Sequence, residues 1–205
     1  MRIGILASGR GSNMEALIEA CRDGRIPAQV AVVLSDRAAA GALETARRLG
    51  VEAHHLNPRD HGSREAFDRA LVAVLQRHGV ELVCLAGYMK LVSREFIGPF
   101  QGRILNIHPS LLPAFPGLDA QRQALEYGCK VAGCTVHIVE LEMDSGPIVM
   151  QAAVPVRDGD TEQTLVARIL EEEHRIYVES VRRFVAGELR VVGRRVVRVA
   201  DPPRP

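Results

Sequence analysis

Short apolar runs alternate with segments of helical period through the first half of the chain, and no other feature constrains the fold as strongly. The apolar runs predict strands at Arg2–Ala7, Val30–Ser35, Glu52–Leu56, Leu82–Leu85 and Arg103–Ile107. Helices are predicted between them at Asn13–Cys21, Gly41–Leu49 and Ser63–Arg77. Strands that alternate with helices form a parallel sheet with right-handed crossovers. We therefore expect an α/β fold with a doubly wound, mostly parallel sheet and flanking helices.

The pattern changes after Asn106. Residues 110–117 are Pro-rich and too broken for a helix or a strand, so they predict a loop. The elements expected after this loop are a strand pair at Lys130–Val139 and Ile148–Pro155, a long helix that starts at a capping box of Asp160 and Gln163 and ends at Val185, and a hairpin of Arg190–Val192 and Arg195–Val199. No repeat or linker divides the chain, so residues 1–200 predict a single domain and residues 201–205 a disordered tail.

Charge and composition narrow the classes of function. The 205 residues carry a formal net charge of +1, which gives no general attraction to nucleic acid or to membranes. No apolar stretch of about eighteen residues is present to span a bilayer. The cysteines lack CxxC spacing, and the adjacent His54 and His55 face opposite ways on a strand, so no metal is predicted. We expect a cytoplasmic protein with reduced thiols that binds neither nucleic acid nor membrane.

A glycine-rich turn, Ser8-Gly9-Arg10-Gly11-Ser12-Asn13, lies between the first strand and the first helix. Glycines let the backbone approach a ligand, and the free N–H groups of a helix start favour an anion. Met14 stands at the third glycine position of the dinucleotide fingerprint G-x-G-x-x-G, so that fingerprint fails. The turn is interpreted as a phosphate site, and the alternative is a tight strand-to-helix turn without a ligand.

Polar side chains end the fifth predicted strand. Asn106 and His108 are two residues apart and therefore point to the same face, at the end of the sheet that borders the ligand crevice. Asn106 can donate to a developing oxyanion, His108 can move a proton near neutral pH, and a carboxylate at Asp144 would favour the imidazolium. This trio suits attack of an amine on a carbonyl. The alternative is that each residue only caps a strand or makes a turn.

These segments together resemble the folate-dependent formyltransferase family, and within it the phosphoribosylglycinamide formyltransferases. The segments that carry the resemblance are Ser8-Gly9-Arg10-Gly11-Ser12-Asn13, Leu85-Ala86-Gly87-Tyr88-Met89-Lys90, Leu105-Asn106-Ile107-His108-Pro109-Ser110-Leu111-Leu112-Pro113, Pro116-Gly117 and Asp144-Ser145-Gly146-Pro147. The resemblance implies a Rossmann-like formyltransferase fold, with residues 1–100 as a phosphate-binding half and residues 101–200 as a folate-binding half. It implies transfer of the formyl group of 10-formyltetrahydrofolate, a co-substrate, to the amine of glycinamide ribonucleotide, without a metal.

The resemblance also implies a role for individual residues. Gly11, Ser12 and Asn13 would hold the substrate phosphate. Asn106 would hold the formyl oxygen, His108 would stabilise it as imidazolium and deliver a proton to N10, and Asp144 would raise the pKa of His108. The implied folate contacts are Arg64, Met89, Lys90, Leu91, Val92 and Asn106.

Other implications of the resemblance are less direct. His137 lies near this region in the family, and its alternative is a histidine satisfied within the sheet. Leu112-Pro113 is expected to be a cis peptide. Some family members have histidines where this chain has Asp119-Ala120-Gln121, so side-chain contacts there are in question. The expected partners are the two small-molecule substrates, and a homodimer is allowed.

Three alternative functions are open. A formyltetrahydrofolate hydrolase would pass the formyl group to water, and such enzymes usually carry a further N-terminal domain. A methionyl-tRNA formyltransferase would need a C-terminal tRNA-binding domain and a basic surface. A non-catalytic nucleotide-binding module would keep the glycine-rich turn but would have no need for Asn106, His108 and Asp144 together.

Overall fold

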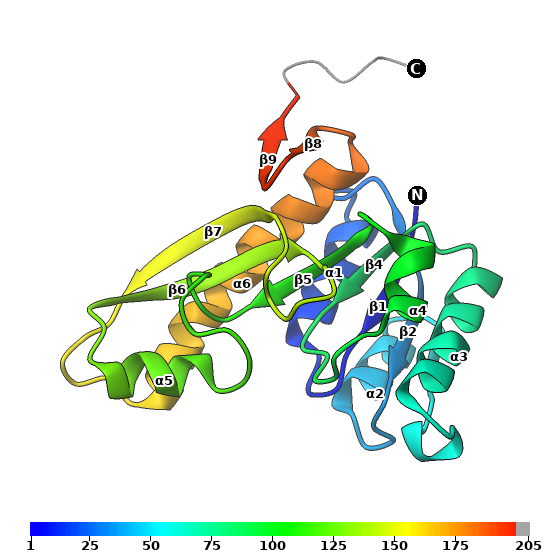
Figure 1. The fold of residues 1–205 in the computed structure, drawn as a ribbon, viewed down its shortest axis with the longest axis horizontal. Coiled ribbons are helices and arrows are strands. Elements are labelled where there is room, and N and C mark those ends of the chain that lie inside the picture. Colours follow the sequence, from blue (N-terminus) through cyan, green and yellow to red (C-terminus); the bar gives the residue numbers. More distant parts are fainter. Residues whose placement is uncertain (200–205) are drawn as a thin grey trace. The chain divides into compact units, whose positions relative to one another are not determined.

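The computed structural model describes residues 1–199 and contains two compact units, Met1–Asn106 and the residues from Ile107 onward (Figure 1). The tail predicted at 201–205 lies outside the described residues. The division after Asn106 coincides with the change in sequence pattern at that residue. The assignment of residues 1–200 to one domain, with halves at 1–100 and 101–200, stays a prediction.

The first unit is built on a parallel sheet. Its strands, in chain order, are β1 (Arg2–Leu6), β2 (Gln29–Ser35), β3 (Ala53–His55), β4 (Leu82–Leu85) and the first three residues of β5 (Ile104–His108). They lie in the order β3-β2-β1-β4-β5, and all of these pairs are parallel. The predicted parallel α/β architecture is confirmed, and each predicted strand is found within one or two residues of its expected ends.

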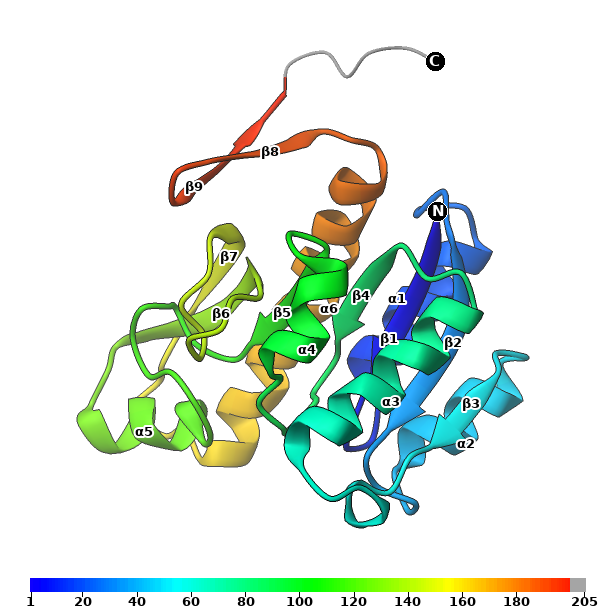
Figure 2. The same cartoon turned by 45° about the vertical axis from the view of Figure 1, so that its right-hand side comes forward.

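Helices cover both faces of this sheet. The longer ones are α1 (Ser12–Arg22), α2 (Gly41–Arg48) and α3 (Arg64–Arg77). The unit also contains the short helix α4 (Arg94–Ile97) and 3-10 turns at Pro58–Asp60 and Gly98–Phe100. Figures 1 and 2 show α3 and α4 together in front of the sheet and α1 behind it, where α2 packs on α1. This placement follows from right-handed crossovers, because the chain moves outward from β1 to β3 and then returns to β4. The residues of α3 predicted to share a buried face are all buried: Phe67, Leu71, Val74 and Leu75.

The second unit pairs two long strands and a long helix. β6 (Val131–Ile138) and β7 (Ile148–Pro155) are antiparallel, and α6 (Glu162–Val185) packs on both. A short helix, α5 (Ala120–Tyr127), packs on α6. The hairpin of β8 (Leu189–Val192) and β9 (Arg195–Arg198) is present as predicted, and Arg195 of β9 pairs in parallel with Ile148 of β7.

The start of the long helix was predicted wrongly. The N-cap is Thr161, whose side chain accepts from the backbone N–H of Thr164, and the Thr164 hydroxyl accepts from the backbone N–H of Thr161. The predicted capping box placed the N-cap at Asp160, with Gln163 as its partner, which is one residue before the observed N-cap. The Asp160 carboxylate instead receives the Arg168 guanidinium at 2.8 Å. Thr and Asp are both good caps, so the sequence pattern does not distinguish neighbouring cap positions.

Two further observations concern the cysteines and the helices. Cys84 and Cys134 are buried among apolar residues, and none of the four cysteines is in a disulfide. Among residues 1–199, no helix combines the length and the apolar character that crossing a membrane requires.

Candidate active site

Ser8 ties together three loops of the first unit, each of which follows the carboxyl end of a strand. Its hydroxyl donates to Asp36 Oδ1 at 2.6 Å and accepts from the backbone N–H of Met89 at 3.0 Å. Its own backbone N–H donates to the Gly87 carbonyl at 3.0 Å. Because Ser8 is buried, these bonds fix the loops after β1, β2 and β4 relative to one another. The sequence showed Asp36 near a strand end but gave no sign of this bridge.

The glycine-rich turn enters α1 through Gly11. Gly11 is the N-cap, with a φ of 87°, and no side chain caps the helix. Ser12 and Asn13 form the first helical turn, where backbone N–H groups have no intrahelical partner. An anion placed here would meet both these donors and the positive end of the helix dipole. Phosphate binding by Gly11, Ser12 and Asn13 stays a prediction, which this geometry accommodates.

Replacement of Gly11 by alanine tests the turn. A Cβ at Gly11 would approach Ala42 Cβ to 2.7 Å, and the left-handed φ would strain any L side chain. We expect Gly11→Ala to destabilise the fold by about 1–3 kcal/mol and to raise the KM for the phosphorylated substrate. Urea denaturation and steady-state kinetics measure these effects. Gly9→Ala is the matched control, because a Cβ at Gly9 meets nothing within 4 Å. Equal effects of the two substitutions would contradict phosphate binding at this turn.

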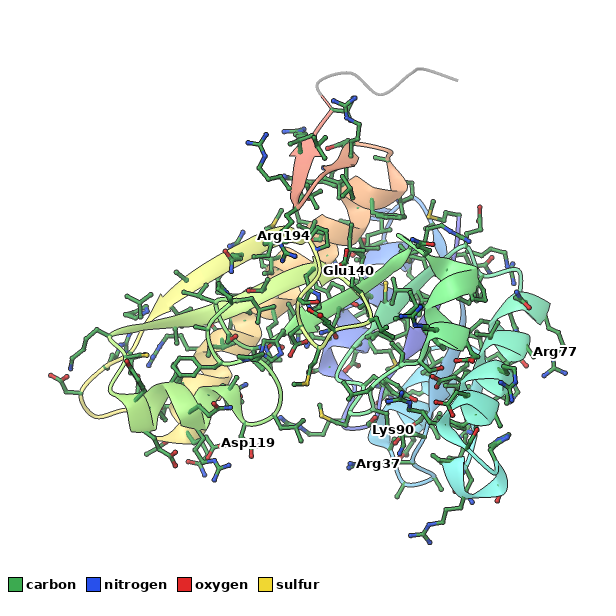
Figure 3. The ribbon with its side chains drawn as sticks, viewed as in Figure 1. Arg37, Arg77, Lys90, Asp119, Glu140 and Arg194 are labelled. Atoms are coloured by element: carbon green, nitrogen blue, oxygen red, sulfur yellow. The ribbon has the colours of Figure 1, made fainter. Side chains whose placement is uncertain are left out.

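A cavity of about 480 Å³ opens beside α3 in the same unit. Its lining residues are Pro58, His61, Ser63, Arg64, Phe67, Asp68, Lys90 and Leu91. Three of the predicted folate residues, Arg64, Lys90 and Leu91, therefore line one pocket. Figure 3 shows Lys90 at the same edge of the unit as Arg37, and both side chains are exposed.

The other predicted folate residues differ in exposure. The Met89 side chain is exposed and Val92 is buried. The loop that contains Met89 and Val92 is held at its end by Asp68 of α3, which accepts the Ser93 backbone N–H at 2.6 Å. Burial raises the pKa of Asp68, and the Ser93 bond partly offsets that effect. This anchor was not visible in the sequence, because an Asp on a helical stripe is usually solvated.

Asn106 and His108 lie on β5, as the sequence predicted. Their separation of two residues places both side chains on the same face of the strand. Asn106 is partly exposed, whereas His108 is buried. A partly exposed amide and a buried imidazole at the end of one strand match the proposed pairing of an oxyanion donor with a proton-transfer group.

Both ring nitrogens of His108, which belongs to the second unit, face oxygen atoms of that same unit. Nε2 lies 2.9 Å from the Phe115 carbonyl, which can only accept, so this nitrogen carries a proton. Nδ1 lies 3.4 Å from Asp144 Oδ2. Burial lowers the pKa of His108, while the Phe115 carbonyl and the Asp144 charge partly restore it. Asp144 thus acts in the predicted direction, but burial outweighs it and leaves the pKa below the ordinary histidine value.

Asp144 is held in an unusual backbone conformation, with a φ of 51°. Its Oδ2 accepts the Gly117 backbone N–H at 2.8 Å, and its Oδ1 lies 3.5 Å from His137 Nε2. Burial raises the pKa of Asp144, but hydrogen bonds from His137 and Gly117 and the nearby His108 outweigh burial and lower it overall. The left-handed conformation is one that Asp tolerates better than most residues. Asp144 keeps this strained backbone conformation in the folded protein, and such strain is common at functional sites.

The loop that follows His108 is fixed by a buried threonine. Thr135 Oγ1 donates to the Ser110 carbonyl at 2.7 Å and accepts the Leu112 backbone N–H at 3.1 Å. Gln151 Nε2 donates to the Leu112 carbonyl at 2.9 Å. The predicted cis peptide at Leu112-Pro113 is present. The polar side chains of β6 and β7 therefore position the segment that contains the family motif.

His137 and residues 119–121 complete the comparison with the sequence. His137 is buried and lies against Asp144, which joins it to His108 through a shared carboxylate. Asp119 has a φ of 57° and pairs with Arg122 at 2.6 Å, and α5 begins at Ala120 (Figure 3). The Phe115 carbonyl and the Gly117 N–H were missed, because backbone groups leave no signal in the sequence.

Comparison with known proteins gives consistent matches. The model of the formyl transferase family matches residues 1–181. A phosphoribosylglycinamide formyltransferase of Escherichia coli (strain K12) is 44% identical over 191 residues, which are 93% of this chain and 90% of that protein. The crystal structure of glycinamide ribonucleotide transformylase 1 from Symbiobacterium toebii is 61% identical, with a TM-score of 0.96, and the match covers 98% of this chain and 94% of that one.

Longer and more distant proteins also match. The trifunctional purine biosynthetic protein adenosine-3 of Homo sapiens is 42% identical over 93% of this chain, which spans 19% of that protein. A formyltetrahydrofolate deformylase from Pseudomonas syringae pv. tomato is 24% identical with a TM-score of 0.88, over 96% of this chain and 65% of that one. At that identity the likeness concerns the fold alone.

Proposed function

Because this chain belongs to the formyl transferase family, we propose that it transfers the formyl group of 10-formyltetrahydrofolate to the amine of 5-phosphoribosylglycinamide. Formyl transfer in purine biosynthesis is the activity that the family and the relatives establish for it. The products are formylglycinamide ribonucleotide and tetrahydrofolate. The assignment of roles to individual side chains, which follows, is our proposal.

The reaction exchanges one C–N bond for another. The amine nitrogen bonds to the formyl carbon, the N10–carbon bond breaks, and the proton lost by the amine finally resides on N10. Asn106 donates to the formyl oxygen as it becomes an oxyanion. His108 moves the proton, because a buried imidazole with a lowered pKa is a stronger acid once it is charged. Asp144 stabilises the imidazolium whenever it forms.

The observation that carries this proposal is the shared carboxylate of Asp144. One carboxylate faces His108 and His137 and is itself held by a backbone N–H. A residue that only made a turn would have no need for two buried imidazoles. The binding roles are proposed for the first unit, with the phosphate at Gly11, Ser12 and Asn13. The folate contacts are proposed at Arg64, Met89, Lys90, Leu91 and Val92, with Asn106 as a further contact.

An absorbance assay with 10-formyl-dideazafolate tests the reaction. We expect loss of the formyl group only when glycinamide ribonucleotide is present, because the amine is the acceptor. Equal loss without the ribonucleotide would identify a hydrolase. Absence of turnover under both conditions would support a binding module without catalysis. The ribonucleotide lacking its phosphate serves as the control for the glycine-rich turn.

We also propose a cytoplasmic location and small-molecule partners only. The free cysteines support a reducing compartment, and the net charge of +1 gives no attraction to nucleic acid or lipid. Homodimer formation stays a prediction, which sedimentation at micromolar concentration would test.

A further inference from the structure

A second group of polar side chains lies at the edge of the first unit's sheet, apart from the residues assigned above. Glu52 directly precedes the edge strand β3, His54 lies within that strand, and His78 is the C-cap of α3. Glu52 Oε1 is 2.7 Å from His54 Nε2, and Glu52 Oε2 is 3.2 Å from His78 Nε2. One ligand atom from each residue lies within 4.8 Å of the others. We call these three residues the edge cluster.

The orientation of His78 is the informative feature of the edge cluster. Its Nδ1 lies 2.8 Å from the Val74 carbonyl, which can only accept, so Nδ1 carries a proton. In the neutral ring Nε2 is then an unprotonated nitrogen that faces a carboxylate oxygen. Two lone pairs at that distance repel, and either a second proton on the ring or a bound cation between the two atoms removes the repulsion. A metal-binding histidine typically has this arrangement, with its second nitrogen donating to a backbone carbonyl.

We propose that Glu52, His54 and His78 bind one divalent transition-metal ion of the zinc class. Two imidazole nitrogens and a carboxylate oxygen are a donor set that zinc accepts, whereas magnesium and calcium prefer oxygen ligands alone. Ligand atoms around a tetrahedral zinc ion are about 3.3 Å apart, as follows from bonds of about 2.0–2.1 Å. The edge cluster needs only small side-chain movements to reach that spacing. Three protein ligands leave one position for water.

The edge cluster lies at the C-terminus of α3, where the carbonyl groups carry the negative end of the helix dipole beside His78. Two guanidinium groups border the cluster and are paired with backbone oxygens, since Arg2 Nε donates to the His78 carbonyl and Arg47 donates to the Ala53 carbonyl. Arg77 is exposed and extends into solvent in Figure 3. Glu52 supplies the negative charge that offsets part of the charge of the ion.

Titration of the whole chelator-treated protein with zinc chloride at pH 7.5 tests the site. We expect calorimetry to show one zinc ion per chain, and cobalt chloride to give the visible absorption of a cobalt–imidazole complex. His54→Ala and His78→Ala should each weaken binding by at least about tenfold. Glu52→Gln changes an exposed side chain and keeps its size, so it gives a third variant that is expected to fold.

His55→Ala is the matched control. His55 is adjacent to His54 on β3 but points to the other side of the strand, and it is exposed. It should leave zinc affinity unchanged. Equal weakening by His55→Ala and His78→Ala would overturn the proposal, as would the lack of binding by the parent protein. Binding that survives in all edge-cluster variants but disappears in His108→Ala would also overturn it, by placing the ion on the other histidine pair.

Discussion

Replacement of His108 by alanine is expected to lower kcat by about 10²- to 10⁴-fold, the range in which a general acid or base contributes. The imidazole is the group that we propose moves the proton from the amine to N10. Its two nitrogens face the Phe115 carbonyl and the Asp144 carboxylate, so the ring is already oriented. Alanine keeps neither nitrogen. Stopped-flow and steady-state absorbance with saturating substrates measure the loss.

Substrate binding separates a chemical role for His108 from a structural one. Calorimetric affinity for glycinamide ribonucleotide should stay close to that of the parent, because the proposed phosphate residues lie in the other unit. His108→Gln is the companion variant, since its amide nitrogen lies at the level of Nε2 and can still donate to the Phe115 carbonyl. It should lose turnover nearly as completely while melting close to the parent temperature. Parental turnover in either variant would contradict the role of His108.

The regular elements could be predicted from the sequence because their patterns are local. The alternation of β1 to β5 with helices follows from apolar period alone, and so does the buried face of α3. The change in sequence pattern at Asn106 coincides with the boundary between the two compact units. Asn106 and His108 could be proposed as site candidates because a spacing of two residues on a strand puts both side chains on one face. The pairing of His108 with Asp144 was a hypothesis that the structure supports by distance.

What the sequence could not show depends on contacts between distant segments. The lowered pKa of His108 results from burial, which no spacing of residues reveals. The Phe115 carbonyl is a backbone group, and the Ser8 bridge joins residues 28 and 81 positions apart. The edge cluster illustrates the same point. His54 and His55 do face opposite ways, but the sequence argument missed that His78, at the end of α3, reaches Glu52.

Replacement of Asp144 by asparagine is the second large effect that we expect, with kcat lowered by about 10²-fold near neutral pH. Asn tolerates the left-handed backbone of this position, and its amide oxygen can still accept from Gly117. The substitution removes the charge and keeps the bond to Gly117. It also places an NH2 group at the position of Oδ1, which faces His137. The change should appear in kcat more than in KM.

The pH dependence distinguishes a charge effect from a packing effect. The Asp144 carboxylate raises the pKa of His108, whereas burial lowers it, so removal of the charge lowers that pKa further. If the imidazolium donates the proton to N10, activity falls as the pH rises through this pKa. That falling limb of the kcat profile should move to lower pH in Asp144→Asn. The kcat values of the parent and the variant should then become similar at low pH, where His108 is charged in both proteins. An equal loss of kcat at every pH, with the falling limb at the same pH as in the parent, would instead mean that Asp144 only holds the loop at Gly117 in place.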